Sequence, residues 1–290
     1  MSTGWAPGKI ILLGEHGVVY GHRAVAAAVS LGTTVQLTKR PGPTGMDAPW
    51  ADDTRLQDAL LCVLPPTGIG VSIQSDLPIG RGMGSSAALA VALGRARAAL
   101  AGEPADDDRL NQDAWAVERV FHGNPSGIDH TVSMAGGAVA YRKTVDGPEI
   151  TPLALSALPL VVIDSGSSGH TAEMVEGVRA RRPQVDATLA EIGALVEAPI
   201  PLLAQPPGPA LGEALHSNHR LLQQIGVSTP TLDALVTMAL SCGAYGAKLA
   251  GAGGGGVVIA LTEDRDHLVQ RARAEGYDAM KISLGAAQRQ

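Results

Sequence analysis

Short apolar runs recur along the chain, and each is bounded by glycine, proline or charged residues. Continuous apolar runs of this length are typical of buried strands, whereas alternation of β-branched and polar residues is typical of a half-exposed strand. The pattern therefore predicts strands at residues 10–13, 33–38, 69–74, 136–141, 159–163, 257–261 and 277–282.

Longer stretches carry apolar residues at helical spacing or are rich in alanine. The clearest begins at Asp106, whose carboxylate can cap a helix, and it places Leu110, Ala114 and Val117 on one face. Strands and helices interspersed in this way predict an α+β fold. Further helices are predicted at residues 23–30, 87–101, 172–181, 184–196, 210–224, 231–241 and 267–275.

A polar, proline-bearing stretch at residues 143–158 lies near the middle of the chain. A length of 290 residues favours two lobes slightly over one large core, so we predict lobes at residues 1–150 and 151–290. The Pro-, Gly- and Asp-rich segment 39–55 is predicted to be a mobile surface loop of the kind that forms lids. Residues 198–209 contain five prolines and are predicted to be a non-helical linker.

Charge and aromatic content argue against a nucleic-acid-binding protein, because the net charge is −6 and only 3% of residues are aromatic. No apolar run reaches the roughly 18–20 residues that a membrane span needs, so a soluble protein with no membrane partner is expected. The N-terminal residues lack the layout of a signal peptide, and a cytoplasmic location is therefore expected.

A run of glycines and hydroxyl residues opens onto an alanine-rich segment. Gly80, Gly82 and Gly84 can adopt positive φ, which lets main-chain N–H groups turn toward a ligand. A helix that begins after them would add free N–H groups and the positive end of its dipole. Ser85 and Ser86 add hydroxyls that can contact a phosphate oxygen or a divalent cation. Glycines, hydroxyl residues and a helix in this order predict a phosphate-binding loop. The loop lacks the Gly-Lys-Ser/Thr of a Walker loop. The alternative is that the glycines only form a tight turn before a helix.

Three polar residues, Lys9, Glu15 and His16, bracket the apolar strand predicted at residues 10–13. One interpretation is structural, with the lysine and glutamate paired at the strand rim and the histidine as a cap. The other is that all three belong to a functional site.

Two carboxylates are further candidates for chemistry. Glu118 lies at the edge of a predicted apolar helix face, where a buried charge needs a cation or hydrogen-bond donors. A neighbouring Arg or Lys and a bound Mg²⁺ are the two candidate partners. Asp129 ends a turn-rich segment in which Pro125 and Gly127 fix the backbone, and it either serves a site or merely caps Thr131.

Three segments together resemble, in order and spacing, the motifs of the GHMP small-molecule kinases; they are residues 7–21, 80–88 and 248–256. That family shares a two-lobed α+β fold. The resemblance implies an N-terminal nucleotide-binding lobe, a C-terminal α+β lobe and an active site between them. It spans nearly the whole chain.

Local patterns at residues 14–21, 118–129 and 217–228 are similar to those of family members that act on mevalonate. Members that act on galactose carry an aspartate where this chain has Gly17. The resemblance implies ATP-dependent phosphorylation of the primary 5-hydroxyl of mevalonate, in the pathway of isoprenoid biosynthesis, and a homodimer. The alternatives are a related kinase that acts on phosphomevalonate or another small alcohol, and a non-catalytic homologue that only binds ligand.

Carried over to this chain, the resemblance assigns roles to individual residues. Asp129 would accept the hydroxyl proton, beside the ammonium group of Lys9. Ser86 and Glu118 would hold Mg²⁺ between phosphate oxygens. Ala250 stands where the family often has threonine close to the substrate. The residues implied to bind ATP are Gly80, Arg81, Gly82, Met83, Gly84, Ser85 and Ser86, and those implied to border the substrate are Lys9, Glu15, His16 and Gly253.

Overall fold

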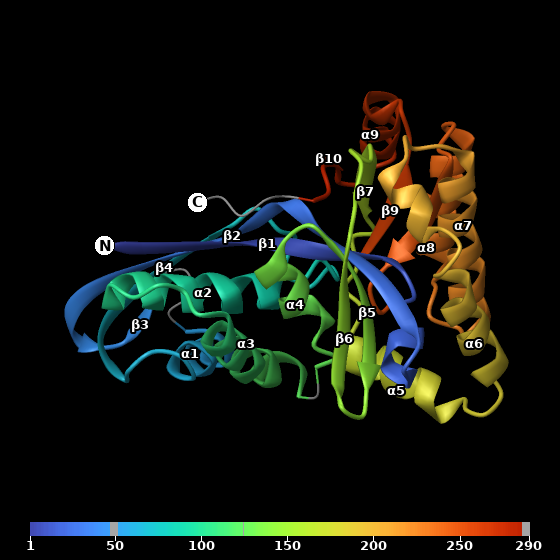
Figure 1. Cartoon of the computed structure of the whole chain (residues 1–290). Coiled ribbons are helices and arrows are strands. Elements are labelled where there is room, and N and C mark those ends of the chain that lie inside the picture. The colour runs from blue at the N-terminus through green and yellow to red at the C-terminus, as the bar shows by residue number, and fades with distance from the viewer. Residues whose placement is uncertain (47–51, 124, 286–290) are drawn as a thin grey trace.

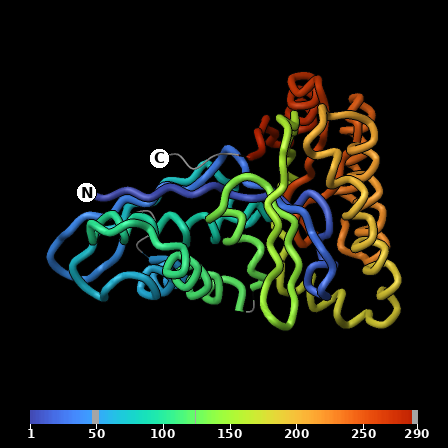
Figure 2. The backbone as a smooth tube through the Cα atoms, in the orientation of Figure 1, coloured from blue at the N-terminus to red at the C-terminus, as the bar shows by residue number. Residues whose placement is uncertain are grey.

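Each half of the chain builds its own β-sheet, and helices pack beside both sheets (Figure 1). This computed structural model describes residues 1–46, 52–123 and 125–285. The N-terminal half lies on one side and the C-terminal half on the other, as the colours along the tube show in Figure 2. Two lobes of mixed helix and sheet confirm the predicted α+β fold.

The first lobe contains strands β1 (Ser2–Leu13), β2 (Arg23–Pro43), β3 (Gly45–Met46), β4 (Thr67–Ser75), β5 (Ala138–Thr144) and β6 (Gly147–Leu153). Its helices are α1 (Thr54–Leu61), α2 (Ser85–Ala101), α3 (Asp107–His122) and α4 (Ile128–Ala135), with a 3₁₀ helix η1 at Gly17–Tyr20. The sheet order is β3-β4-β2-β5-β6, and β1 pairs with β2 outside this path. Only the short β3 runs parallel to its neighbour in this sheet, as far as the described strands show. Helix α2 packs against β1 and β2.

The second lobe contains strands β7 (Leu160–Asp164), β8 (Gly246–Ala250), β9 (Val257–Leu261) and β10 (Ala279–Ile282). They form an antiparallel sheet of order β10-β7-β9-β8. Helices α7 and α8 pack against β8, and α9 packs against β7 and β10. The helices are α5 (Thr171–Ala180), α6 (Asp186–Leu195), α7 (Pro209–Gln224), α8 (Pro230–Ser241) and α9 (Arg265–Ala274), with a 3₁₀ helix η2 at Ile200–Ala204.

The chain crosses from the first sheet to the second between β6 and β7. Its C-terminal segment then returns to the first lobe, where Leu284 forms a β-bridge with Val29. The N–H of Ser30 donates to the main-chain oxygen of Ser283 at 2.9 Å. The two lobes also share one hydrophobic core, which includes side chains from β1, β2, β7 and β9. The division into lobes at residue 150 stays a prediction.

The helix predicted at residues 23–30 is wrong, because this segment forms the first part of β2. Alanine favours a helix in isolation, but here the backbone is paired on both sides, to β1 and to β5. The side chains at 24–29 are all fully buried. Pairing and burial therefore override the intrinsic preference of alanine.

The surface loop predicted at residues 39–55 is also wrong over its described part. Strand β2 continues to Pro43, β3 follows, and α1 begins at Thr54. Asp53 caps α1 by accepting the N–H of Leu56 at 2.9 Å. Residues 47–51, including Trp50, lie outside the described residues, and the predicted lid falls there with them.

The stretch Asp186–Ala204 is long and apolar enough to cross a membrane by length and composition alone, with a mean hydropathy of 1.4. The expectation that no apolar run reaches that length is therefore wrong. The stretch comprises α6, a turn and η2, and Leu189, Ile192 and Leu203 pack in the hydrophobic cores. The prediction of a non-helical linker at residues 198–209 is therefore wrong over Ile200–Ala204, which form the 3₁₀ helix η2, and at Pro209, where α7 begins.

His219 on α7 connects three elements of the second lobe. Its Nδ1 accepts the N–H of Leu249 on β8 at 3.3 Å, and its Nε2 lies 3.2 Å from Oδ1 of Asp233 on α8. Because Nδ1 accepts, the neutral ring carries its proton on Nε2 and donates it to Asp233. Burial is the main cause that lowers the pKa of His219 to about 4.

Acid should destabilise the protein through His219. Its pKa falls from 6.5 to about 4 on folding, so the unfolded state binds more protons between these values. The stability present above pH 6.5 is lost as the pH falls toward 4, by about 3 kcal/mol at most. When the pH is lowered from about 7.5 to about 5, the melting temperature of His219→Gln should therefore fall less than that of the wild type. The exposed His267→Gln is the control, and an equal acid loss in His219→Gln would contradict this prediction.

Candidate active site

The loop-to-helix geometry predicted for the glycine run is confirmed. Gly80, Gly82 and Gly84 have φ values of 71°, 80° and 70°. Gly84 is the N-cap of α2, and a Cβ there would lie 2.8 Å from Cγ of Lys9. The first turn of α2 begins at Ser85, and its N–H groups have no intrahelical acceptor. The loop thus presents main-chain donors at the positive end of a helix dipole, an arrangement suited to phosphate groups.

Lys9 on β1 directs its ammonium group into the interior, and only 4% of the side chain is exposed. Its Nζ lies 3.1 Å from Oδ1 of Asp129 and donates to the main-chain oxygen of Gly82 at 3.4 Å. Its main-chain N–H donates to the oxygen of Met83 at 3.0 Å. Lys9 therefore joins Asp129 to the glycine loop. The alternative in which Lys9 pairs with Glu15 is wrong.

Asp129 lies in the first turn of α4, which Gly127 caps with a φ of 91°. Its carboxylate pairs with Lys9 and, within the described ranges, caps no N–H group, so the capping alternative is wrong. The buried hydroxyl of Tyr141 donates to the main-chain oxygen of Ser126 at 2.7 Å. Tyr141 thereby fixes the backbone that presents Asp129. Sequence reasoning missed this role, because Tyr141 looked only like the last residue of a strand.

Glu118 extends from α3 into the same region and is 1% exposed. Its Oε1 has no hydrogen-bond partner, and no Arg or Lys forms an ion pair with it in the described part of the chain. Burial, followed by the charge of Asp129, raises the pKa of Glu118 to about 7, while Ser86 and Lys9 oppose this rise. An unpartnered buried carboxylate oxygen fits a bound cation, and its hard oxygen suits Mg²⁺. The Arg or Lys alternative is therefore wrong.

Ser86 supplies the second hard oxygen of this region. Its Oγ lies 3.0 Å from Nε2 of His122, a neighbour that sequence reasoning missed. No three His, Cys, Asp or Glu side chains converge as a metal cage among the residues described. A Mg²⁺ ion here would depend on Ser86, Glu118 and the oxygens of a bound phosphate, which is typical of Mg²⁺ at nucleotide sites.

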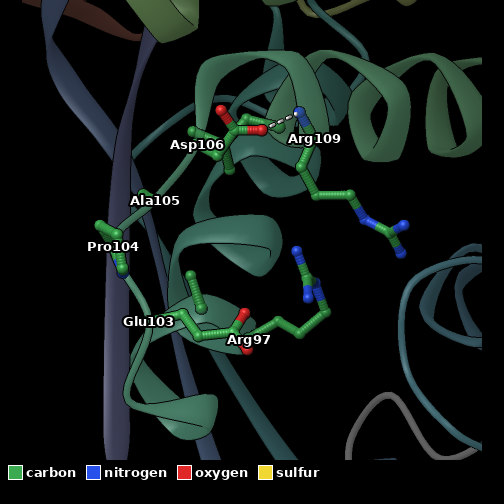
Figure 3. A pocket seen from close by; sticks show the side chains of 8 residues that line it. Arg97, Glu103, Pro104, Ala105, Asp106 and Arg109 are labelled. Carbon is green, nitrogen blue, oxygen red and sulfur yellow. Dashed lines mark hydrogen bonds between the residues drawn. The ribbon is translucent and has the colours of Figure 1, made fainter.

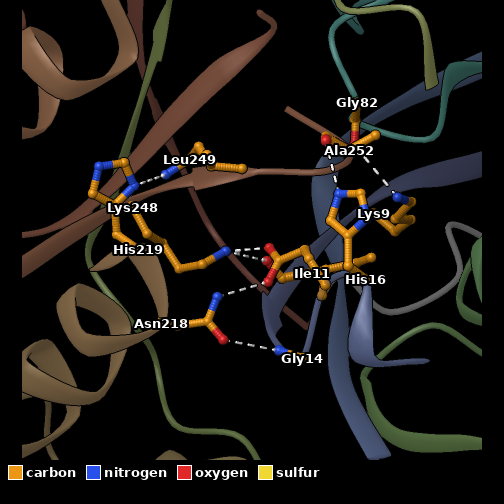
Figure 4. A network of polar contacts seen from close by, with 11 residues as sticks. Lys9, Ile11, Gly14, His16, Gly82, Asn218, His219, Lys248, Leu249 and Ala252 are labelled. Atoms are coloured by element: carbon orange, nitrogen blue, oxygen red, sulfur yellow. Dashed lines mark hydrogen bonds and ion pairs between the residues drawn. The ribbon is translucent and has the colours of Figure 1, made fainter. Parts of the chain in front are cut away.

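Glu15 is buried, and its partners Lys248 and Asn218 belong to the polar network of Figure 4. Lys248 on β8 forms an ion pair with its Oε1, and Nδ2 of Asn218 on α7 donates to its Oε2 at 3.1 Å. The side chains of Lys248 and Glu15 are 0% and 1% exposed. Both carboxylate oxygens are thus occupied by the second lobe. Contact between Glu15 and a substrate stays a prediction.

His16 follows Glu15 with a φ of 60°, a positive value that is uncommon outside glycine. Its Nε2 lies 2.9 Å from the main-chain oxygen of Ala252, and its buried Nδ1 has no partner in the described ranges. His16 occupies the N-cap position of η1, but its side chain makes no cap hydrogen bond there, so a capping role of the ring is not borne out. Burial lowers the pKa of His16, which keeps the ring neutral at neutral pH.

The second glycine cluster approaches the phosphate loop from the other lobe. A Cβ at Gly82 would lie 3.1 Å from the main-chain oxygen of Ala250. Nε of Arg81 forms an ion pair with Oδ2 of Asp164 at 2.9 Å. The cluster, residues 251–256, therefore lets the backbones of the two lobes pack closely at Gly82. Contact of Arg81 with ATP and of Gly253 with substrate stays a prediction.

A separate hollow of about 370 Å³ lies at the start of α3 (Figure 3). Arg97 and Arg109 line it, and both form ion pairs with Asp113 at 3.1 Å. None of the predicted site residues lines this hollow. The hollow is therefore separate from the cluster of Lys9 and Asp129.

Family models match both lobes. The GHMP kinases N terminal domain matches residues 54–137, and the GHMP kinases C terminal domain matches residues 200–278. Among curated relatives, the mevalonate kinase of Thermococcus gammatolerans is 36% identical over 92% of this chain and 91% of its own length. The mevalonate kinase of Archaeoglobus fulgidus is 36% identical over 88% of this chain and 90% of its own length.

Solved structures share the fold over nearly the whole chain. The crystal structure of L. major mevalonate kinase in complex with R-mevalonate has a TM-score of 0.87 and 28% identity, covering 99% of this chain and 97% of that one. Streptococcus pneumoniae phosphomevalonate kinase in complex with phosphomevalonate and AMPPNP has a TM-score of 0.81 and 19% identity, covering 98% of this chain and 100% of that one. At 19% identity, the second likeness indicates a shared fold alone.

Glu118→Gln should stabilise the metal-free protein at alkaline pH. The pKa of this carboxyl rises from 4.5 to about 7 on folding, so stability is highest below pH 4.5 and is lost as the pH rises toward 7. At about pH 8 the buried charge costs about 3 kcal/mol, which the neutral amide removes.

Melting temperatures in EDTA provide the measurement. The variant should melt above the wild type at about pH 8, and the two should converge near pH 4.5. Glu103→Gln, at an exposed position, serves as the control. Equal melting temperatures of Glu118→Gln and wild type at about pH 8 would show that the carboxyl is not perturbed.

Proposed function

The chain belongs to the GHMP kinase family, and on that premise we propose that it transfers the γ-phosphoryl group of ATP to the primary 5-hydroxyl of mevalonate. The product would be 5-phosphomevalonate, an intermediate of isoprenoid biosynthesis. One observation carries the proposal: the ion pair of Lys9 and Asp129 lies beside a phosphate-type loop, near Glu118, whose buried Oε1 has no partner among the described residues.

In the proposed reaction, Asp129 accepts the proton of the attacking hydroxyl. The ammonium of Lys9, 3.1 Å away, pairs with this carboxylate and can face the oxygens of the transferring group. Phosphoryl transfer passes through a loose transition state, so catalysis depends mainly on position and charge. The burial of Lys9 keeps water from screening that charge.

The glycine loop would bind the phosphates of ATP through its main-chain N–H groups and those of the first turn of α2. Ser86 and Glu118 would hold Mg²⁺, and a bound Mg²⁺ neutralises charge on phosphate oxygens. Glu118 has the position and the free oxygen for this role, and a nearby cation would favour its ionised form.

The two rival functions have less support. A kinase for phosphomevalonate needs further cationic groups for the second phosphate, and Arg81 of the loop is already paired with Asp164. A non-catalytic homologue would not need a lysine, an aspartate, a serine and a buried glutamate around one phosphate-type loop. A cytoplasmic location and a homodimer stay predictions.

Substrate choice is tested by ADP release with mevalonate, phosphomevalonate and galactose in parallel. We expect mevalonate to exceed both others in kcat/KM by about a hundredfold or more, because polar groups built for one substrate are left unpaired by another. A preference for phosphomevalonate would replace the proposed substrate. ADP release with none of the three would favour the non-catalytic alternative.

Asp129→Asn tests the proposed base. Turnover should fall by about 10²–10⁴-fold, because the amide cannot accept the hydroxyl proton. The affinity for ATP, measured by calorimetry, should change little. Asp186→Asn, at a surface ion pair with Arg182, is the matched control and should retain turnover. Near-normal turnover of Asp129→Asn would show that another group takes the proton.

A further inference from the structure

One residue of the turn that follows β1, His16, adopts a backbone conformation that a residue with a Cβ does not favour. Gly14 has a φ of 96° and His16 a φ of 60°. In the described part of the chain, His16 is the single non-glycine residue with a positive φ. Such a conformation is costly for a residue with a Cβ and persists only where the surroundings hold it.

The second lobe supplies the contacts that hold this turn (Figure 4). The N–H of Gly14 donates to Oδ1 of Asn218 at 3.2 Å, and Nδ2 of Asn218 donates to Oε2 of Glu15 at 3.1 Å. Lys248 forms an ion pair with Oε1 of Glu15 and donates to the main-chain oxygen of Ile11 at 3.4 Å. The end of β1 and the turn are thus fixed to α7 and β8 together.

The ion pair at the centre of this network is buried on both sides. Lys248 is 0% exposed and Glu15 is 1% exposed. Burial lowers the pKa of Lys248, and the charge of Glu15 opposes that shift. Removal of one partner would leave an unpaired buried charge, whereas replacement of both by neutral side chains removes the charge altogether. The two charges therefore depend on each other.

The network leads to one unsatisfied atom of His16. Because Nε2 lies 2.9 Å from the oxygen of Ala252, Nε2 carries the ring proton and Nδ1 presents a lone pair. Nδ1 is buried and has no hydrogen-bond partner among the described residues, and His16 is 5% exposed. A buried acceptor without a donor marks a place for a hydroxyl of a bound ligand.

Both sides of the His16 contact are held by the same ion pair. Glu15 precedes His16 in the turn, and Lys248 lies on β8, which leads to Ala252. In the described ranges, Glu15, Lys248 and Asn218 form no hydrogen bond to the glycine loop. Across the part of the chain that the structure describes, the network thus has no direct hydrogen bond to the ATP side of the site, and β8 approaches that side only at Ala250, beside Gly82.

We propose that Glu15, Lys248 and Asn218 are positioning residues that hold His16 so that its Nδ1 accepts a hydroxyl of the substrate, and that Glu15 itself does not contact the substrate. This inference rests on the proposed kinase function and deepens it. It assigns a role to Lys248 and Asn218 and gives Glu15 a role different from that of a substrate ligand.

A double-mutant cycle on the ion pair tests the proposal. Glu15→Gln and Lys248→Met are each expected to raise the KM for mevalonate by about tenfold or more, with the KM for ATP changed less than about threefold. The double variant lacks both charges, so its KM for mevalonate should lie at least about fivefold below the product of the single effects.

A matched control breaks an exposed ion pair between the lobes. Arg23 and Glu197 lie 2.8 Å apart at the surface, and Arg23→Met should leave both KM values unchanged. Single effects that multiply in the double variant would show that Glu15 and Lys248 act independently and would overturn the proposal. An equal rise of both KM values would indicate general loosening and would overturn it as well.

Nitrogen NMR of the His16 ring gives a readout that does not depend on turnover. The wild type should show the proton on Nε2, and Lys248→Met should show a mixture of the two tautomers. A Lys248→Met spectrum identical to that of the wild type would overturn the proposal. Two further variants test the proposal if Lys248→Met does not fold. The double variant should then fold, and Asn218→Ala should raise the KM for mevalonate but not the KM for ATP. Failure of either result would overturn the proposal. Absence of wild-type turnover with mevalonate would instead reject the proposed function.

Discussion

The buried ammonium group of Lys9 is the contact on which the geometry of the candidate active site depends. A charge taken out of water needs partners, and Lys9 finds a carboxylate on α4 and a main-chain oxygen in the glycine loop. Because these partners belong to separate segments, one side chain sets the distance between the proposed base and the phosphate loop. The low exposure of Lys9 also strengthens its attraction to Asp129.

The parts of the site that follow from local backbone chemistry could be predicted from the sequence. Alternating glycines before an alanine-rich segment indicated a loop that leads to a helix N-terminus, and the three loop glycines indeed have positive φ. Asp106 indicated the start of α3, and its side chain accepts the N–H of Arg109 at 3.0 Å. The apolar stripe of that helix then predicted the burial of Glu118. Each of these inferences needs only neighbours within a few turns of the chain.

What the sequence could not supply depends on residues far apart along the chain. Residues 23–30 form a strand because β1 and β5 pair with them, and nothing within the segment itself distinguishes that strand from an alanine-rich helix. The partners of Glu15 lie 203 and 233 residues away, at Asn218 and Lys248. Tyr141 likewise acts through a main-chain oxygen that no pattern reveals. These features arise from packing of the two lobes or of distant strands.

The bridge between Val29 and Leu284 gives the molecule a second crossing between its lobes, besides the one between β6 and β7. The bridge lies beside other contacts between the lobes, among them the shared hydrophobic core and the buried ion pair of Lys248 and Glu15. A movement that separates the lobes near β2 would have to break the pairing of Val29 with Leu284 and of Ser30 with Ser283. The last described residues thus fasten the second lobe to the sheet of the first.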